Sequence, residues 1–460
     1  MTLTVQATST YFDNNDVIKS LFTGLMEKGY NPLIMQAKRN FISIFDKNNS
    51  MDILLDQLTS GSISTTEEET ASEYLRRFVA DREQRARRGS KVAGDIFFSL
   101  NEEGILYVLI TEVISLDKTK KPNTRYRLEI GYLGDDSHTC PLDDFRKSVT
   151  EILSNQLQST KWEPFLQPNS KFNELQKSEK TKFVTADAFS SKDIEFAEWL
   201  EDQAVRQVAI DIKSAGGGML VEELGKNLEA GELKRITDRL IKTNLIVREY
   251  AIICQKTSKQ ISRVQSLEAI KEADKLGFTC TCGKSYSEEN IKELFRPTSD
   301  LKKMLDKSYW VTARLVSVLR RLGVPDNCIL LNLEEGPNEI DAALHVDGMF
   351  FMVELKDDEF AMGHAYRYGS RISIYKPDCA IIVSTKGVSP DVKEHFKRAD
   401  QEADIVYVEN LNEIDNAFRL LVENARRKRA SEIISFLGPV TIPLSQILSI
   451  RIGVNLSTSS

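Results

Sequence analysis

The sequence predicts a multidomain α/β protein. At 460 residues the chain is too long for one ordinary hydrophobic core, and its length suggests about three domains. Segments with the apolar period of helices alternate with short apolar or alternating runs typical of strands. Apolar residues make up 41% of the chain, as in folded globular proteins. The expected order is an N-terminal α/β domain of unknown role (1–165), a winged helix (190–252), a ribbon-like segment (253–298), an α/β core domain (300–428) and a C-terminal tail (429–460).

Composition limits the partners of the chain. The formal net charge of −7 argues against a surface uniformly adapted to nucleic acid, because phosphate contacts need a local excess of Lys and Arg. Two local basic clusters, residues 76–88 and Arg426 to Arg429, are candidates, although such clusters are more often solvated helix faces. No apolar run approaches the roughly 18 residues of a membrane span, and the start lacks the features of a secretory signal. Six dispersed cysteines suit a reducing compartment, so we expect a cytoplasmic protein without a membrane partner.

The N-terminal domain carries no recognisable motif. Strand-like runs at 95–100, 105–114 and 126–132 precede a helical pattern at 142–157. The domain could sense a ligand, hold a partner or close a homo-oligomer, and the sequence leaves these alternatives open. Residues 167–185 are polar and predict a linker.

Residues 191–254 show three helical segments followed by a strand, which predicts a winged helix. The helices are expected at 191–212, 219–228 and 230–243, with a turn at Gly216 to Gly218. The third helix turns Leu233, Ile236, Leu240 and Ile241 inward. Its polar face carries Lys234, Arg235, Arg239 and Lys242. That composition is typical of a recognition helix that binds DNA, although winged helices also pack or dimerise without DNA.

The next segment resembles half of a zinc ribbon. Cys280-Thr281-Cys282-Gly283 supplies two ligands, and Cys254 could act upstream. Structural zinc sites take four ligands, and only three are visible. The histidines, His138, His345, His364 and His395, lie elsewhere. We therefore expect at most weak zinc binding.

The stretch NEIDAALHVDGMFFMVELKDDEF (338–360) predicts a β-hairpin. Asp347-Gly348 is the dipeptide that type I′ turns prefer, and apolar or alternating runs flank it. A two-residue loop places Asp341 opposite Glu354 and Glu339 opposite Lys356, so the four charges share one face. The expected apolar face holds Ile340, Ala342, Leu344, Val346, Met349, Phe351, Val353 and Leu355. His345 is expected on the charged face, as a hydrogen-bonding side chain rather than a ligand.

Paired carboxylates across a strand ladder predict a metal site. Like charges at Asp341 and Glu354 are unfavourable unless a cation or a proton offsets them. Mg²⁺ or Mn²⁺ would accept both carboxylates and leave positions for water and a phosphate. The Lys356 ammonium could stabilise the charge that develops during phosphodiester cleavage. The alternative is a solvated strand face on which Lys356 pairs with Glu339.

Asp341, then twelve residues, then Glu354-Leu355-Lys356 resembles the PD-(D/E)XK nuclease superfamily. The Asn-Glu-Ile-Asp lead-in is similar to its Mrr-type and archaeal Holliday-junction-resolvase branch, and similar cores occur in CRISPR ancillary nucleases. The resemblance implies a restriction-endonuclease-like core of order α-β-β-β-α-β-α over roughly residues 300–425. The expected elements are helices at 309–322, 360–373 and 389–402, and strands at 328–333 and 379–384 besides the hairpin.

The resemblance implies a metal-dependent endonuclease with Asp341, Glu354 and Lys356 as catalytic residues. It also implies DNA more than RNA as substrate, and a role in restriction or antiphage defence, alone or with a defence partner protein. One departure is that the first helix starts Ser308-Tyr-Trp-Val-Thr-Ala-Arg, without the metal-directed carboxylate of many relatives; Asp306 is the nearest. Asp357 and Asp358 could enter the shell of a second metal ion, but their place directly after Lys356 favours a cap of the strand in solvent. The departure keeps a second function open, that of a non-catalytic DNA-binding or assembly protein built on a nuclease-like scaffold.

Overall fold

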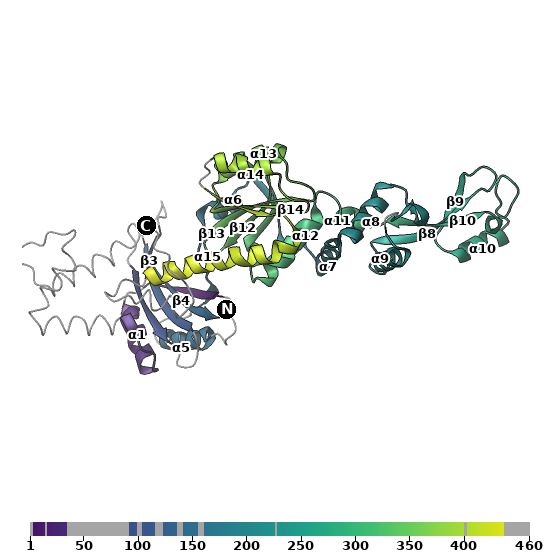
Figure 1. Cartoon of the computed structure of the whole chain (residues 1–460). Helices are drawn as coiled ribbons and strands as arrows, with labels where there is room; N and C mark the ends of the chain where they lie inside the picture. The colour runs from purple at the N-terminus through teal and green to yellow at the C-terminus, as the bar shows by residue number, and fades with distance from the viewer. Residues whose placement is uncertain are drawn as a thin grey trace, which may run out of the picture. The chain divides into compact units, whose positions relative to one another are not determined.

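The computed structural model describes residues 3–13, 16–34, 92–98, 104–115, 123–135, 141–154, 161–225, 228–399 and 403–436. The chain divides into two compact units (Figure 1). Unit 1 comprises 1–168, 346–348 and 420–460, and unit 2 comprises 169–345 and 349–419. The described residues form three sheets with helices, which confirms the predicted α/β class. The basic cluster at 76–88 lies outside the described residues, and no described helix is long and apolar enough to span a membrane.

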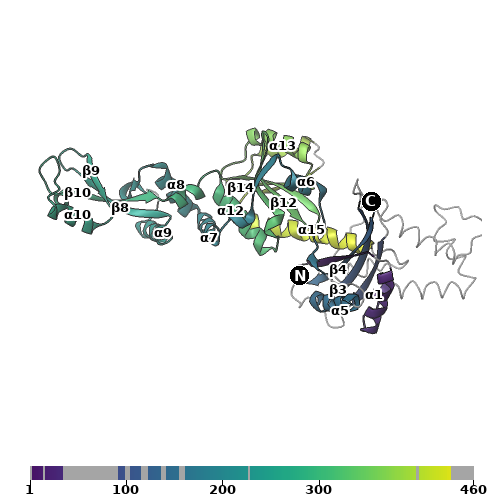
Figure 2. The same ribbon diagram turned by 180° about the vertical axis from the view of Figure 1, so that it is seen from behind.

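Unit 1 contains an antiparallel sheet in the order β2-β3-β4-β1-β5. Its elements are β1 (Leu3–Phe12), α1 (Asp16–Glu27), β2 (Val92–Phe98), β3 (Gly104–Ser115), β4 (Asn123–Asp135), α5 (Leu142–Ser154) and β5 (Glu163–Pro164). Figure 2 shows α1 and α5 on one face of this sheet, where their apolar residues share a core with the strands. The three predicted strands and the helix are confirmed as β2, β3, β4 and α5, while β1 and α1 were not predicted.

The second face of this sheet packs against the end of α15 (Ile414–Phe436). Ala430 and Ile433 are buried there, and Arg429 lies 2.9 Å from the buried Glu129 carboxylate, which also accepts a 2.8 Å hydrogen bond from the Tyr107 hydroxyl. The expected boundary between residues 428 and 429 therefore falls inside a helix. The basic cluster Arg426 to Arg429 lies within α15, and three of its members, Arg426, Arg427 and Arg429, form ion pairs inside unit 1.

Unit 2 begins with two elements where a linker was expected. These are α6 (Ser170–Lys177) and β6 (Thr181–Thr185), followed by the 3₁₀ turn η2 (Ala186–Ala188). Phe172 and Leu175 are buried in the core, and β6 pairs with β11 (Ile329–Glu335) at the sheet edge. The linker prediction is wrong because Phe172, Leu175 and Phe183 give a short polar segment an apolar side that packs on the sheet.

The next elements form a four-stranded sheet with helices, in the order β7-β10-β8-β9. They are α7 (Ser191–Leu200), α8 (Gln203–Ser214), β7 (Met219–Leu220), η3 (Val221–Glu223), α9 (Ala230–Lys242), β8 (Ile246–Ile253), β9 (Gln260–Val264), α10 (Leu267–Lys275), η4 (Tyr286–Glu288) and β10 (Asn290–Pro297). The predicted third helix is confirmed as α9, and the glycine turn is confirmed by positive φ at Gly216 and Gly218.

Two helix predictions in this region are wrong. The expected helix at 191–212 is two helices, because the Asp202 side chain accepts hydrogen bonds from Ala204 N and Val205 N and so starts α8 afresh. The expected helix at 219–228 is instead the strand β7 and the turn η3. The glycine turn places Met219 and Leu220 beside β10, and these two residues pair with β10 as a short antiparallel strand instead of starting a helix.

The remaining elements of unit 2 build a mixed six-stranded sheet, in the order β15-β14-β13-β12-β11-β6 (Figure 1). They are α11 (Ser299–Met304), α12 (Tyr309–Arg321), η5 (Asp326–Cys328), β11, β12 (Asn338–Val346), β13 (Met349–Lys356), α13 (Met362–Tyr375), β14 (Cys379–Ser384), α14 (Pro390–Arg398), β15 (Asp404–Val408) and η6 (Leu411–Glu413). β13, β14 and β15 run parallel, and β11 is antiparallel to β12 and β6. The expected elements between 309 and 402 are thus present, and β15 is an addition.

The predicted hairpin is confirmed as β12 and β13. Asp347 has φ 47° and Gly348 φ 88°, the pair of left-handed residues that a type I′ turn requires. The predicted division of its faces is wrong at Ile340, which lies in one cluster with Phe350 and Met352. Asn332 on the neighbouring strand has φ 48° at a β-bulge, so the inward positions change parity there, and Ile340 is paired with the inward Leu333.

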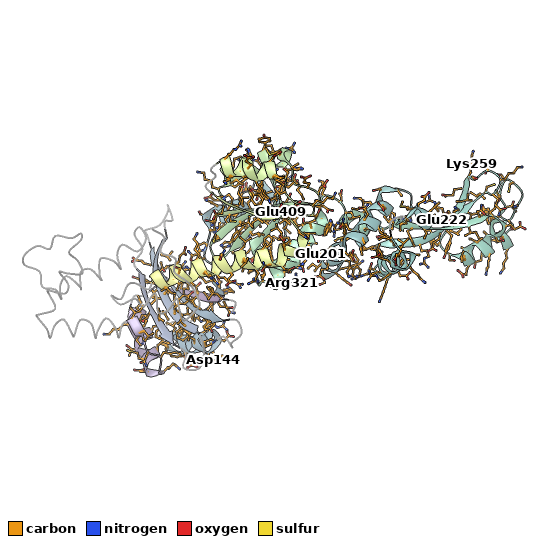
Figure 3. All side chains as sticks on the ribbon, in the orientation of Figure 1. Asp144, Glu201, Glu222, Lys259, Arg321 and Glu409 are labelled. Carbon is orange, nitrogen blue, oxygen red and sulfur yellow. The ribbon has the colours of Figure 1, made fainter. Side chains whose placement is uncertain are left out.

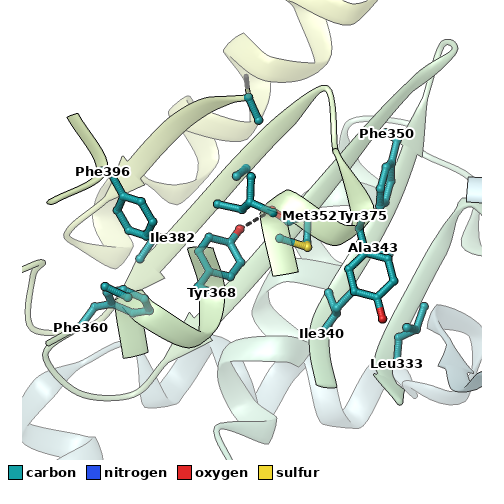
Figure 4. Close-up of a cluster of buried hydrophobic side chains, with 14 of the residues drawn as sticks. Leu333, Ile340, Ala343, Phe350, Met352, Phe360, Tyr368, Tyr375, Ile382 and Phe396 are labelled. Atoms are coloured by element: carbon teal, nitrogen blue, oxygen red, sulfur yellow. Dashed lines mark hydrogen bonds between the residues drawn. The ribbon is translucent and has the colours of Figure 1, made fainter. Parts of the chain in front are cut away.

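Helices α13 and α14 cover one face of this sheet and bury a cluster of apolar side chains (Figure 4). The Tyr368 hydroxyl lies in this cluster, 2.7 Å from Met352 O and 3.0 Å from Ile381 N. It joins α13 to the two parallel strands β13 and β14. The charged face of the hairpin is therefore covered by a helix rather than open to solvent.

Candidate active site

The structure brings the three predicted catalytic residues together. Asp341 lies on β12, and Glu354 and Lys356 lie on the adjacent strand β13. One Asp341 oxygen accepts a 2.7 Å hydrogen bond from Leu355 N, which holds that carboxylate beside the neighbouring strand. The Lys356 ammonium lies 3.0 Å from Glu354 Oε1. Two carboxylates and one ammonium thus meet at the carboxyl end of β13.

Glu354 has a second cationic partner that the sequence did not reveal. Arg371 on α13 donates a 2.7 Å hydrogen bond to Glu354 Oε2, so each oxygen of this buried carboxylate contacts a cation. Arg371 lies three residues after the buried Tyr368 and one before the buried Ile372. The helical period therefore offered a signal, since it places Arg371 on the face of α13 that packs on the sheet.

The pKa values of Asp341 and Lys356 are both raised by their surroundings. Burial, followed by the nearby Glu354 carboxylate, raises the pKa of Asp341 from 3.8 to about 7. Burial alone would lower the pKa of Lys356, but the Glu354 and Asp341 carboxylates outweigh it and raise that pKa. The fold therefore favours the protonated form of Asp341, and a divalent cation could take the place of the proton.

His364, another residue outside the predicted site, stands near this group on the first turn of α13. Burial and then the charge of Lys356 lower its pKa below 6.5, while Glu354 opposes that shift. The imidazole is thus neutral at neutral pH. His345, in contrast, is buried against the Phe172 ring, with Nδ1 3.9 Å from the Cys328 thiol. The expectation that His345 is not a ligand fits this position, but its surroundings are a core rather than a charged face.

The aspartates that follow β13 differ from each other. The Trp310 indole donates a 2.7 Å hydrogen bond to Asp357 Oδ2, and the Thr385 hydroxyl donates a 3.1 Å bond to Oδ1. Asp357 therefore anchors α12 to the sheet, which corrects the expectation of a solvent-facing cap. Asp358 is exposed and pairs with Lys386 at 2.9 Å. Asp306 is exposed, and the first turn of α12 carries no carboxylate.

The predicted recognition helix keeps its basic face outward. Lys234, Arg235, Arg239 and Lys242 on α9 are all exposed, while Ile236 and Leu240 are buried. Arg235 lies 3.9 Å from Glu232, and the Arg239 guanidinium stacks over the Trp199 ring at 4.6 Å. Arg239 thus packs against α7, whereas Lys234, Arg235 and Lys242 keep their charges on the exposed face of α9.

The three cysteines of the ribbon-like segment also converge, and a fourth donor joins them. Ligand atoms of Cys254, Cys280, Cys282 and Glu289 all lie within 4.8 Å of one another. The Cys282 thiol donates a 2.8 Å hydrogen bond to Glu289 Oε1, which raises the pKa of Cys282 to about 12. Hydrogen bonds from Thr257 lower the pKa of Cys254 to about 7. The sequence pattern did not single out Glu289, because cysteine and histidine are the usual zinc ligands and a lone glutamate carries no such signal.

Comparison with known proteins adds little to this geometry. No family model matches the chain, and no curated protein matches it. Among solved structures, protein VC1899 from Vibrio cholerae has a TM-score of 0.34 and 10% sequence identity, over 62% of this chain and 75% of that one.

Proposed function

We propose that the chain is a metal-dependent endonuclease that hydrolyses phosphodiester bonds of nucleic acid, DNA more than RNA. The observation that carries the proposal is the convergence of Asp341, Glu354 and Lys356 at one end of β13, with an Asp341 pKa near 7. Two carboxylates placed side by side repel each other unless a proton or a cation lies between them, and a divalent ion accepts one or two such ligands. This arrangement, on an α-β-β-β-α-β-α order, supports assignment to the PD-(D/E)XK superfamily and its Mrr-type or Holliday-junction-resolvase-like branch.

Asp341 and Glu354 are the residues that would hold Mg²⁺ or Mn²⁺, since both offer hard carboxylate oxygens. The ion would polarise the scissile phosphate and lower the pKa of an attacking water. Lys356 would place its ammonium next to the phosphate and stabilise the negative charge that grows there. Arg371 holds Glu354 by one oxygen and so fixes the direction of the other. Neutral His364 would border the site without adding a competing cation.

The order α7, α8, α9 and a β8–β10 wing supports a winged helix that presents DNA to this site through Lys234, Arg235 and Lys242 on α9. The ribbon-like segment is then the tip of the wing. We further propose a restriction or antiphage role in the cytoplasm, with unit 1 controlling the nuclease as a ligand sensor, partner-binding or homo-oligomer domain. These biological roles follow from the superfamily resemblance.

A second candidate is a non-catalytic DNA-binding or assembly protein. Two observations favour it: α12 contributes no carboxylate, and both oxygens of Glu354 are already paired with cations. A cleavage assay separates the two functions. The parent should cut plasmid DNA, or single-stranded DNA or RNA, in Mg²⁺ or Mn²⁺ but not in a chelator.

Asp341→Ala and Glu354→Ala should abolish this cleavage, because each removes a ligand and a negative charge from the ion. Glu359→Ala, at an exposed carboxylate just past the site, is the matched control and should cut like the parent. A folded Glu354→Ala protein that cuts every substrate at the parent's rate would sink the proposal. A parent that binds DNA and cuts none of the substrates would favour the scaffold function.

A further inference from the structure

The Cys254, Cys280, Cys282 and Glu289 cluster joins three separate pieces of backbone. Cys254 directly follows β8, Glu289 directly precedes β10, and Cys280 and Cys282 lie in a turn that the Cys280 N to Lys284 O bond and the Gly283 N to Cys280 O bond close. The insert 255–288 therefore leaves and returns to the wing at this one cluster. Figure 3 shows Lys259 on this outer part of the wing, and its carbonyl accepts a hydrogen bond from Cys254 N.

The insert has almost no apolar core of its own. Between residues 255 and 289, all of which the structure describes, the buried apolar side chains are Ile270 and Cys280. Larger apolar groups face solvent instead: Leu267 is 44% exposed, Phe278 54% and Leu276 76%. A segment of this size that cannot bury apolar surface is usually held by disulfides or by a metal. The cysteines of the cluster are free thiols, so a disulfide does not supply the link.

Glu289 is a buried carboxylate that faces the three cysteines. It is 5% exposed, and its two oxygens contact the Cys282 thiol at 2.8 Å and Gln255 N at 2.7 Å. The contact to Gln255 N orients one oxygen, and the other points at the three sulfur atoms with a thiol proton between them. A metal ion that displaced that proton would gain a fourth ligand already held in place.

We propose that Cys254, Cys280, Cys282 and Glu289 form a structural zinc site that closes the wing insert. Three thiolates select a borderline-soft ion such as Zn²⁺ over Mg²⁺ or Mn²⁺, and a carboxylate is an accepted fourth ligand. Four protein ligands leave no open position, so the ion stabilises the insert and takes no part in chemistry. The sequence predicted weak zinc binding because only three ligands were visible. Glu289 is the proposed fourth ligand. This site is independent of the carboxylates at Asp341 and Glu354.

Metal analysis of the full chain tests the site. Protein expressed with zinc and separated from loose metal by gel filtration should carry about one Zn²⁺ per chain. Cys280→Ser and Cys282→Ser should lose it, and Glu289→Gln should weaken Zn²⁺ binding at least about tenfold, a loss seen even for outer-shell partners. Glu272→Gln, exposed on α10 in the same insert, and Cys379→Ala, a buried cysteine of β14, are the matched controls and should keep the ion.

Two further readouts keep the test decisive if a variant folds poorly. Co²⁺ added to the metal-free parent should give the thiolate charge-transfer and tetrahedral ligand-field bands of a sulfur-rich site, and these should be lost in Cys282→Ser. Removal of zinc from the parent should increase tryptic cleavage within 255–289 and leave the six-stranded sheet protected. A parent that holds no zinc, gives no Co²⁺ bands and shows no change in tryptic cleavage on chelation would overturn the proposal.

Discussion

Replacing Asp341 by asparagine should stabilise the metal-free protein at pH 8, although it removes a charged residue from the proposed site. The Asp341 pKa is about 7 against an ordinary value of 3.8, so keeping the carboxyl ionised inside the fold is unfavourable. A pKa unit corresponds to about 1.4 kcal/mol, and this difference of about 3 units sets an upper limit of about 4 kcal/mol on the gain. Asparagine keeps an oxygen that can accept the hydrogen bond from Leu355 N.

The sign follows from proton uptake. The unfolded chain releases the Asp341 proton near pH 4, whereas the folded chain keeps it until about pH 7. Folding stability therefore falls as pH rises through this window, and the full deficit is present above pH 7. Asparagine does not ionise, so its advantage over the parent should grow between pH 5 and pH 7 and then level off.

Thermal unfolding in buffer free of Mg²⁺ and Mn²⁺, at pH 5 and pH 8, measures this difference. One kcal/mol shifts Tm by about 2–4 °C in a unit of 150–250 residues, so the variant should gain several degrees at pH 8. Asp306→Asn, at an exposed aspartate, should show no pH-dependent gain. An Asp341→Asn protein whose advantage is equal at both pH values would refute the electrostatic reasoning.

Three other changes test separate parts of the molecule. Lys356→Ala should reduce the rate of cleavage more than Mn²⁺ affinity, because an ammonium stabilises charge rather than coordinating; equal loss of both in rate and binding assays would contradict this role. Arg235→Ala should weaken DNA binding and lower the slope of log K against log salt by about one unit, and Lys275→Ala on α10 should not; equal slopes would assign α9 to packing. Tyr368→Phe should lower the free energy of unfolding by about 1–3 kcal/mol, because it strands a buried carbonyl and amide; an unchanged denaturant midpoint would show that their hydrogen bonds are replaced.

Local patterns predicted the hairpin and the core elements well because their causes are local. Asp347-Gly348 sets the register of β12 and β13, and the almost wholly apolar run of β14 is typical of a strand inside a parallel sheet. Asp202 also acts locally, because its side chain caps the start of α8. The apolar period of residues 191–212 nevertheless predicted one continuous helix, since it runs through this cap. The capping signal of Asp202 was readable in the sequence.

Other features depend on contacts between distant segments. Ile340 changes face because Asn332, eight residues earlier, takes a left-handed conformation that no sequence rule required. Glu289 meets Cys254 across an insert of more than thirty residues, and α6 and β6 are stabilised by a sheet formed mainly by residues beyond 329. The helical period alone could have placed Arg371 on the face of α13 that packs on the sheet. Its contact with Glu354 was not predicted, because Glu354 was expected on a face that no helix covers.

The most direct test of the proposed nuclease site is anomalous diffraction from crystals of the full chain soaked in Mn²⁺. We predict one strong peak bound by carboxylate oxygens of Asp341 and Glu354 at about 2.1 Å. Glu354 should then give up its present contact with either Lys356 or Arg371 on the oxygen that binds the ion. A map without a peak there, in which Glu354 still contacts both cations, would contradict a metal-dependent site at this hairpin.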